Sequence, residues 1–468
     1  MTALCLLLSL ACCGLRSAAT AQETIAGRWE GEIELPGQRL AVGIVFRLID
    51  GSWDGAMDVG SLTGVALHEV TQEGPSVHFE MGVTQVTAIF DGHVEGDEMS
   101  GKVLQEGEGT FVLRRAREVD LDEPIRALME EKHIPGLAAA AIRDGEVVWV
   151  GTYGFENLAE QRPVTEETLF LLASVSKTIT ATALMQLHSE GRFDLDDDVS
   201  DYLPFTVRNP GFADLPITFA QLLRHRSSIR DNMAFYGPLW SAARGDSDTV
   251  LGQYLASYLV EGGEHFDRED NFFPERPGTE FRYCNTCYAL LGYLAEVISG
   301  QPFEDHSAEV LFAPLEMTQT GWFYSDVDSS RVALGYRYDE DEGHVPVGPV
   351  GYPDWPAGQL RSSLTELARF LAAYTGFGLF DGAQVIDSTT VELMAPRHQA
   401  VGFYTWFGSS FPVTGSVLYT HGGGDLGART LIGFDPATRN GFVVLTNGEA
   451  SIDDIAALIL EATPTLGW

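Results

Sequence analysis

The sequence predicts an all-β domain over residues 22–116, folded as a barrel or a sandwich, followed by an α/β domain over residues 117–468. Three observations lead to this division. Apolar residues alternate with period two from Ile25 to Arg115, as they do in half-buried strands. A charged segment, Arg114–Asp122, then marks a boundary. Beyond it, apolar stretches of helical length alternate with short strand-like runs.

Residues 1–21 are predicted to form a secretory signal peptide that is cleaved before Gln22. The apolar run from Ala3 to Leu15 is too short to span a bilayer, and Ala19-Thr20-Ala21 has the form of a cleavage site. Leu10-Ala11-Cys12 leaves a lipid-anchored N-terminus as an alternative. We therefore expect an exported protein, periplasmic or extracellular, with no integral membrane span.

The β domain is predicted to contain about eight short strands. The clearest alternation runs from Leu40 to Leu48, with Val42, Ile44 and Phe46 between them. Turn residues separate the apolar runs, at Pro36-Gly37, Asp50-Gly51, Glu73-Gly74-Pro75, Asp91-Gly92 and Glu95-Gly96-Asp97. No nucleophile in this region is accompanied by a base, so we expect an accessory domain that packs or binds.

The charge of the chain narrows its partners. The 67 acidic residues outnumber the 29 basic ones, which gives a net charge of −38. Nucleic acids and anionic membrane surfaces require a basic surface, so we expect neither as a partner. The sequence does not indicate an oligomeric state.

The two cysteines of the mature chain, Cys284 and Cys287, are spaced C-x-x-C. Two thiols without matching histidines are too few for a structural zinc site. In an oxidising compartment they could pair in a disulfide or act as a redox couple. They could equally be two small buried apolar side chains, and the sequence leaves these alternatives open.

In the α/β region the pattern predicts helices and strands in alternation. A helix and a hairpin come first, and three strands with a final helix close the chain. The predicted helices are 124–132, 171–187, 218–225, 288–298, 364–374 and 452–462, and the predicted strands are 137–142, 147–150, 417–420, 430–434 and 441–446.

The segment Leu171–Leu187 carries the first candidate for catalysis. Ser174 and Lys177 are three residues apart, so on a helix they project from one face. A serine hydroxyl becomes a useful nucleophile when a neighbouring amine in a desolvated pocket takes its proton. The S-x-x-K pattern alone is weak, because four-residue patterns recur by chance.

Two further motifs make the pattern specific. Tyr283-Cys284-Asn285 has the form Y-x-N, and His421-Gly422-Gly423 has the form H-x-G. With Ser174-x-x-Lys177 ahead of them, the chain from about Glu118 onward resembles the serine hydrolases related to class C β-lactamases and penicillin-binding DD-peptidases. The sequence around these motifs also resembles that family over most of this region, including residues 133–149, 222–228, 287–303, 314–322, 356–363 and 443–448.

The resemblance implies a β-lactamase/transpeptidase-like domain in which helices flank an antiparallel sheet and a helical region supplies Ser174. Ser174 would form an acyl-enzyme, Lys177 would accept or position its proton, and Tyr283 would shuttle protons with a phenol whose pKa nearby cations lower.

The remaining motif residues are expected to bind or support the substrate. Asn285 would bond the substrate amide or the lysine, while His421 and Gly423 would form one wall of the cleft, the glycines allowing close approach of substrate. The backbone N–H groups of Ser174 and Gly424 are the expected oxyanion donors. No metal or organic cofactor is implied, and the expected partner is a small-molecule or peptide substrate.

Three departures from the family pattern bear on the substrate. The usual H-T-S-G stretch reads His225-Arg226-Ser227-Ser228, without its glycine, and cysteine occupies the middle of Y-x-N. His421 stands where dedicated β-lactamases of this group carry lysine, and histidine is only partly protonated near neutral pH. We therefore expect an esterase or peptidase rather than an efficient β-lactamase.

The sequence gives less support to other classes of protein. An α/β-hydrolase would place an H-G-G-G loop before a G-x-S-x-G elbow, but here His421-Gly422-Gly423-Gly424 lies near the C-terminus and the elbow is absent. No H-E-x-x-H or comparable cluster indicates a metallohydrolase. The serious alternative is a catalytically silent binding or regulatory protein of the same fold, although Ser174, Lys177 and Tyr283 are all present.

Overall fold

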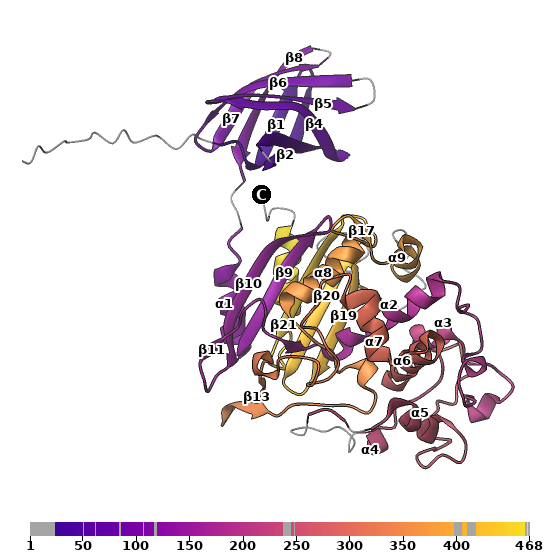
Figure 1. The fold of residues 1–468 in the computed structure, drawn as a ribbon. Helices are drawn as coiled ribbons and strands as arrows, with labels where there is room; N and C mark the ends of the chain where they lie inside the picture. Colours follow the sequence, from indigo (N-terminus) through magenta and orange to yellow (C-terminus); the bar gives the residue numbers. More distant parts are fainter. Residues whose placement is uncertain are drawn as a thin grey trace, which may run out of the picture. The chain divides into compact units, whose positions relative to one another are not determined.

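The computed structural model describes residues 24–49, 51–60, 62–83, 86–105, 107–116, 119–236, 245–247, 249–396, 405–409, 418–463 and 466. The predicted signal peptide lies outside the described residues. The chain divides into two compact units, one ending at Glu118 and one running from Val119 to Gly467. Each unit is described by itself (Figure 1).

The first unit is a closed barrel of eight strands in chain order, which selects the barrel from the two predicted alternatives. All neighbouring strands are antiparallel, and β1 pairs with β8 to close the barrel. Gly37, Gly51, Gly74 and Gly96 all have positive φ values, confirming four of the predicted turns. The strands are β1 Gly27–Leu35, β2 Gln38–Ile49, β3 Ser52–Val59, β4 Leu62–Glu73, β5 Ser76–Val83, β6 Val86–Glu95, β7 Glu98–Gln105 and β8 Gly107–Arg115.

The barrel interior is filled by apolar side chains. Phe79 stacks on Phe90 at 4.6 Å between ring centroids, and Phe111 meets Phe90 edge-on at 5.6 Å. A Cβ atom at Gly92 would lie 2.6 Å from the Phe111 ring, and one at Gly101 would lie 2.8 Å from it. The prediction of a turn at Asp91-Gly92 is therefore wrong: Gly92 lies inside β6 and makes room for an aromatic ring.

The second unit is built on a seven-stranded antiparallel sheet with the order β11-β10-β9-β21-β20-β19-β18. In Figure 1 the purple strands β9 and β10 lie beside the yellow strands β20 and β21, so both ends of this unit share one sheet. The strands are β9 Gly136–Arg143, β10 Glu146–Asn157, β11 Arg162–Pro163, β18 Phe407–Ser409, β19 Leu418–Asp425, β20 Ala428–Asp435 and β21 Asn440–Thr446.

Strand β9 is buried along its whole length because helices cover both faces of the sheet. Ala138, Ala140 and Ile142 belong to a core that includes α8 (Leu364–Thr375). The alternate residues, Leu137, Ala139 and Ala141, belong to a core shared with α1 (Asp122–Glu131) and α10 (Asp453–Ala462). Small alanines on both faces let helices approach the sheet from either side. The predicted fold class, an antiparallel sheet flanked by helices, is confirmed.

A largely helical region connects the two parts of this sheet. Its central helix, α2 (Ser176–Ser189), is buried over most of its surface and contacts α6 (Asn285–Ser299). The other helices are α3 Phe219–Leu223, α4 Met233–Tyr236, α5 Leu251–Leu259, α7 Phe303–Ser307 and α9 Ser388–Met394, and the short strands are β12 Phe170–Leu171, β13 Gly335–Asp339, β14 Gly343–Val347, β15 Arg361–Ser362, β16 Leu379–Phe380 and β17 Ala383–Gln384. In the described part of the chain, no helix is long and apolar enough to cross a membrane.

Candidate active site

Ser174 lies in a short 3-10 helix, Ala173–Val175, that leads directly into α2. Lys177 follows in the first turn of α2, and its Nζ donates a hydrogen bond to Ser174 Oγ at 3.0 Å. The two side chains therefore meet as their three-residue spacing predicts. Ser174 is partly exposed, whereas Lys177 is fully buried.

Lys177 has several partners that fix its ammonium group. Nζ also donates to the carbonyl oxygen of Ala357 at 2.6 Å. It lies 5.1 Å from the ring centroid of Tyr283 and 5.8 Å from that of Tyr288, within the range of cation–π attraction. A buried ammonium with two oxygen acceptors and two ring faces is held in one place beside the serine.

The turn that carries Ser174 is anchored by two hydrogen bonds at Leu172. The Leu172 N–H donates to Leu360 O at 2.9 Å, and Thr430 Oγ1 donates to Leu172 O at 2.7 Å. Ala173 has φ +46°, a conformation in which side chains are strained. The surrounding contacts hold the residue before Ser174 in this unfavourable geometry.

Gly423 is required by these same contacts. A Cβ atom there would come within 2.2 Å of Leu172 O and 2.2 Å of Thr430 Oγ1. From the sequence alone, glycine is expected here because it lets substrate approach the strand closely. The structure instead shows Gly423 packed against the chain's own backbone beside Ser174.

Tyr283 is close to the lysine but is not bonded to the serine. Its ring stacks on His225 at 4.4 Å between centroids, and 39% of the residue is exposed. Among the described residues, its hydroxyl makes no hydrogen bond with Ser174 or Lys177. Catalytic hydrogen bonds are often long before substrate binds, so this geometry leaves Tyr283 within the candidate site.

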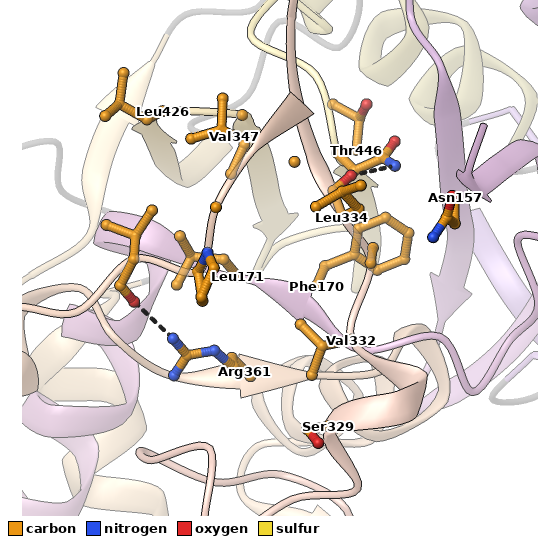
Figure 2. A pocket seen from close by; sticks show the side chains of 18 of the residues that line it. Asn157, Phe170, Leu171, Ser329, Val332, Leu334, Val347, Arg361, Leu426 and Thr446 are labelled. Atoms are coloured by element: carbon orange, nitrogen blue, oxygen red, sulfur yellow. Dashed lines mark hydrogen bonds between the residues drawn. The ribbon is translucent and has the colours of Figure 1, made fainter. Parts of the chain in front are cut away.

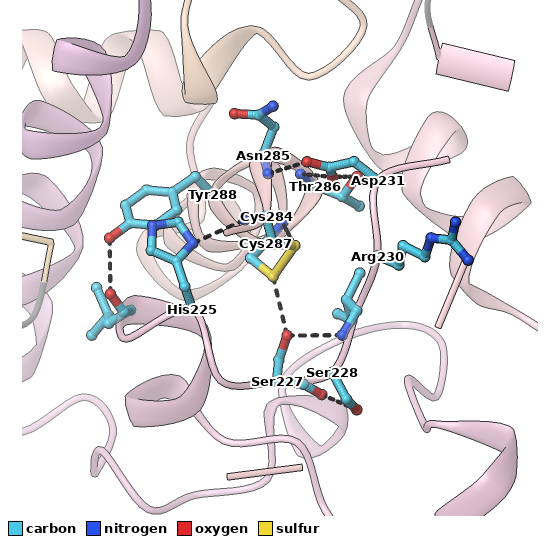
Figure 3. Close-up of a disulfide and its surroundings, with 12 residues drawn as sticks. His225, Ser227, Ser228, Arg230, Asp231, Cys284, Asn285, Thr286, Cys287 and Tyr288 are labelled. Carbon is cyan, nitrogen blue, oxygen red and sulfur yellow. Dashed lines mark hydrogen bonds between the residues drawn. A yellow bond between two sulfur atoms is a disulfide. The ribbon is translucent and has the colours of Figure 1, made fainter. Parts of the chain in front are cut away.

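Asn285 is the first residue of α6, and Asp231 caps that helix. The Asp231 carboxylate accepts from the N–H groups of Asn285 and Thr286, at 2.7 and 2.9 Å, and from Thr286 Oγ1 at 2.8 Å. A carboxylate at a helix N-terminus satisfies free N–H groups and complements the helix dipole. Figure 3 shows the Asn285 side chain pointing away from this cap.

Cys284 and Cys287 form a disulfide across the first turn of α6 (Figure 3). The structure thereby decides among the alternatives that the sequence left open. Both cysteines are fully buried, and the Cys284 N–H donates to His225 Nδ1 at 3.1 Å. Cys284 stands between Tyr283 and Asn285, so the disulfide constrains the turn that carries both residues.

Ser228 occupies the place of the missing glycine in the family stretch. Its φ is +65°, in the left-handed region that glycine adopts without strain. Its hydroxyl accepts a hydrogen bond from Asn209 Nδ2 at 2.8 Å. The backbone conformation expected for glycine is thus present, and a side-chain hydrogen bond offsets its cost.

His421 is buried in the sheet rather than exposed to a substrate. Its Nδ1 is 3.0 Å from Gly422 O, its ring packs 5.1 Å from Phe407, and Nε2 has no partner among the described residues. Burial, together with the charge of Lys177, lowers the pKa of His421 to about 3. The imidazole is therefore uncharged at neutral pH, which corrects the prediction from sequence that it is partly protonated.

A cavity of about 70 Å³ adjoins Ser174. Of the other site residues predicted from sequence, Asn285 and Gly424 also line it, whereas Lys177, Tyr283, His421 and Gly423 lie outside its lining. In the described residues, β18 pairs with β19 only as far as Thr420. Gly424 therefore lies on a stretch of β19 whose outer edge is not paired by β18.

The cavity contains acidic and aromatic residues that no sequence motif indicated. Asp354, Asp425 and Tyr352 all line it, and Tyr352 donates to Asp425 Oδ2 at 2.6 Å. Burial raises the pKa of Asp354 to about 8, and the nearby Asp231 carboxylate adds to this while Lys177 opposes it. Asp354 lies three residues before Ala357, whose carbonyl binds Lys177, but only the fold shows that it reaches the cavity.

A larger cavity of about 260 Å³ lies beside β12 and β15 (Figure 2). Phe170, Leu171 and Val332 line it together with Arg361, which donates to Val350 O at 2.7 Å. None of the site residues predicted from sequence lines this cavity.

Within the described ranges, one group of side chains could hold a metal ion: Glu69, His78 and Glu80 of the barrel, whose ligand atoms lie within 4.8 Å of one another. All three residues are at least partly exposed.

The fold and the Ser174–Lys177 pair define a serine hydrolase with a β-lactamase-like domain. The model of the family described as Beta-lactamase matches residues 121–462, so the chain belongs to this family. It is 29% identical over 304 residues to penicillin-binding protein 4 of Amycolatopsis lactamdurans, covering 63% of this chain and 72% of that protein.

Other similarities agree with this assignment. Protein flp of Staphylococcus aureus (strain N315) is 26% identical over 54% of this chain, but the match spans only 47% of flp. The octameric penicillin-binding protein homologue of Pyrococcus abyssi superimposes with a TM-score of 0.57 at 27% identity, covering 74% of this chain and 78% of that one. The predicted family membership and enzyme class are confirmed.

Proposed function

We propose that this serine hydrolase works through an acyl-enzyme on Ser174 and prefers ester or peptide carbonyls to β-lactams. The observation that carries the proposal is the 3.0 Å separation between Lys177 Nζ and Ser174 Oγ. Over this distance Lys177, after its ammonium group has given up a proton to solvent, can take the serine proton as Oγ attacks a carbonyl carbon.

The proposed reaction has two halves. The Ser174 Oγ–carbonyl bond forms, and the N–H groups of Ser174 and Gly424 donate to the resulting oxyanion. Collapse breaks the bond to the leaving alcohol or amine, which receives the serine proton through Lys177 and Tyr283. Water then attacks the acyl-enzyme, and its proton returns along the same route to Ser174, releasing a carboxylic acid.

The electrostatics of the third motif support the substrate preference. A fixed cation is suited to binding the carboxylate that common β-lactams carry. His421 is uncharged and lies outside the cavity lining, so it provides no such cation. In this proposal Asn285 binds the substrate carbonyl or amide group from the cavity wall, while His421 and Gly423 support the strand behind it.

The remaining parts of the proposal concern the setting of the enzyme. We retain the prediction that the chain is exported and cleaved before Gln22, and a buried disulfide is typical of oxidising compartments. Residues 22–116 would act as an accessory domain, and the hydrolase domain would use no cofactor.

Intact-mass analysis tests the proposal directly. The mature protein and its Ser174→Ala variant are exposed briefly to an activated acyl ester and, separately, to penicillin. We expect an acyl adduct on the wild type alone, formed faster with the ester. Faster acylation and turnover with penicillin would contradict the preference. No adduct and no turnover above the variant would favour a catalytically silent binding protein.

A further inference from the structure

Carboxyl groups outnumber cations around the cavity at Ser174. Asp354 and Asp425 line it, and Asp231 is near enough to raise the pKa of Asp354. Lys177 is the cation that acts on both lining carboxyls. Arg429 lies beside Gly424 but is exposed and donates to the carbonyl of Glu449 at 3.0 Å. With an uncharged His421, a positive charge that enters the cavity meets more carboxyl groups than cations, and it favours the charged forms of those carboxyl groups.

The three carboxyl groups differ in whether they already have a partner. Asp231 accepts three hydrogen bonds at the start of α6. Asp425 accepts one from Tyr352 and one from the Leu426 N–H. Hydrogen bonds within the protein therefore already satisfy carboxyl oxygens of both Asp231 and Asp425.

Asp354 is less fully bonded, because a backbone N–H supports its carboxyl group but one of the two carboxyl oxygens has no donor. Only 2% of the residue is exposed, yet its Oδ1 accepts no hydrogen bond from the described residues. A buried polar atom without a partner is costly, and such atoms in native structures call for an explanation. The same carboxyl lines the cavity beside the nucleophile, where a donor group of a bound substrate would satisfy it.

The cavity has room for a small charged group. Its volume of about 70 Å³ exceeds the ~10–15 Å³ of such space that one water needs. An ammonium group with a methyl-sized neighbour therefore fits beside Ser174.

We infer that Asp354, assisted by Asp425, binds a protonated amine on the acyl part of the substrate, so that the enzyme favours esters or amides of amino acids with a free amino group. This inference rests on the proposed acylation of Ser174. Asp354 acts as a specificity residue: burial holds a proton on its carboxyl in the free enzyme, and a bound ammonium favours release of that proton to solvent. The resulting carboxylate pairs with the ammonium, and the acyl carbon beside it is presented to Ser174.

The test compares two esters of the same shape. Alanine ethyl ester, as both enantiomers, carries an ammonium where ethyl isobutyrate carries a methyl group. For the wild type at neutral pH, kcat/KM is measured for each ester. Each value is divided by the rate constant for hydrolysis of the same ester by hydroxide, so that the ratio does not reflect the intrinsic reactivity of the esters. We expect one enantiomer of the alanine ester to be favoured at least about tenfold, the factor given by one hydrogen bond between charged groups.

Two variants locate the effect. In Asp354→Asn the alanine-to-isobutyrate ratio should fall by about tenfold. Asp305→Asn changes an exposed aspartate of α7 that is outside the cavity lining, and it should leave the ratio unchanged. An equal loss for both esters in Asp354→Asn would show a merely structural role and would overturn the inference.

Measurements on the wild type alone keep the inference testable if Asp354→Asn does not fold. Ethylammonium should inhibit hydrolysis of ethyl isobutyrate more strongly than ethanol at the same concentration. Equal inhibition, or a wild-type ester ratio near one, contradicts amine binding while leaving Ser174 acylation intact. Failure of both esters to acylate Ser174 in the mass assay would instead contradict the proposed function itself.

Discussion

Gly423 of β19 lies directly against the carbonyl oxygen of Leu172, and a Cβ atom at Gly423 would approach that oxygen to 2.2 Å. Leu172 is two residues before Ser174, and its carbonyl also accepts the Thr430 hydroxyl. The third motif therefore helps to set the position of the turn that carries Ser174, through a contact that only a residue without a side chain can make.

Gly423→Ala should displace β19 from the Ser174 turn. We expect a loss of about 1–3 kcal/mol in the free energy of unfolding, as for other overpacked sites. We also expect kcat/KM to fall about 100-fold, because small displacements of a nucleophile are costly. Gly422→Ala is the matched control, since its Cβ would meet no atom closer than 3.7 Å. Similar losses for both variants, measured by urea unfolding and ester hydrolysis, would contradict this role of Gly423.

Lys177→Met should remove the amine that contacts Ser174 while keeping an unbranched side chain in the buried site. We expect kcat/KM for an activated ester to fall about 10²- to 10⁴-fold, the range for loss of a general base. Lys177 is one of three lysines in the chain. Lys132→Met serves as the control: it also removes a lysine, but one that pairs with Asp454 and belongs to none of the three motifs. Retention of more than a tenth of wild-type activity in Lys177→Met would argue against the lysine as base.

Replacing the disulfide by the pair Cys284→Ser and Cys287→Ser should loosen the turn between Tyr283 and Asn285. The closed loop is short, so the chain-entropy effect on the free energy of unfolding is about 2 kcal/mol. We expect a lower Tm and a lower kcat with esters. A reducing agent should lower the activity of the wild type and leave the double variant unaffected. If reduction is verified by mass and activity does not change, the disulfide has no part in holding the site.

Asp354 should make stability depend on pH. Its pKa is about 8 in the folded protein and near 3.8 as an unperturbed carboxyl. The folded state therefore holds this proton more tightly than the unfolded state, and its stabilising effect is complete below pH 3.8 and is lost as the pH rises to about 8. We expect the Tm of the wild type to decline between these values relative to Asp354→Asn. Parallel profiles of Tm against pH for the two proteins would contradict the raised pKa.

Local patterns in the sequence were sufficient to predict the strands of the barrel and most of its turns. Alternation with period two predicted the barrel strands because strand side chains alternate between the barrel interior and the outside. The glycines of four turns were identifiable because tight turns require positive φ. Gly92 misled the same reasoning, since a glycine that accommodates the Phe111 ring looks, in sequence, like a glycine that makes a turn.

The spacing of Ser174 and Lys177 was also sufficient to predict their contact, because one helical turn fixes their relative placement. The pairing of Cys284 with Cys287 was not decided by the sequence, since burial and disulfide formation are compatible with the same spacing. The protonation of His421 likewise depends on neighbours that are distant in the chain, including Lys177.

By itself, the sequence determined that an all-β domain precedes the hydrolase domain, the family, and the contact between Ser174 and Lys177, because each depends on residues close together in the chain or on a motif. Only the tertiary structure decided that Gly423 packs on Leu172, that His421 is buried and uncharged, and that Asp354 enters the cavity at Ser174. These properties arise from burial and from contacts between distant segments, and local patterns of residues predict neither the burial nor the contacts.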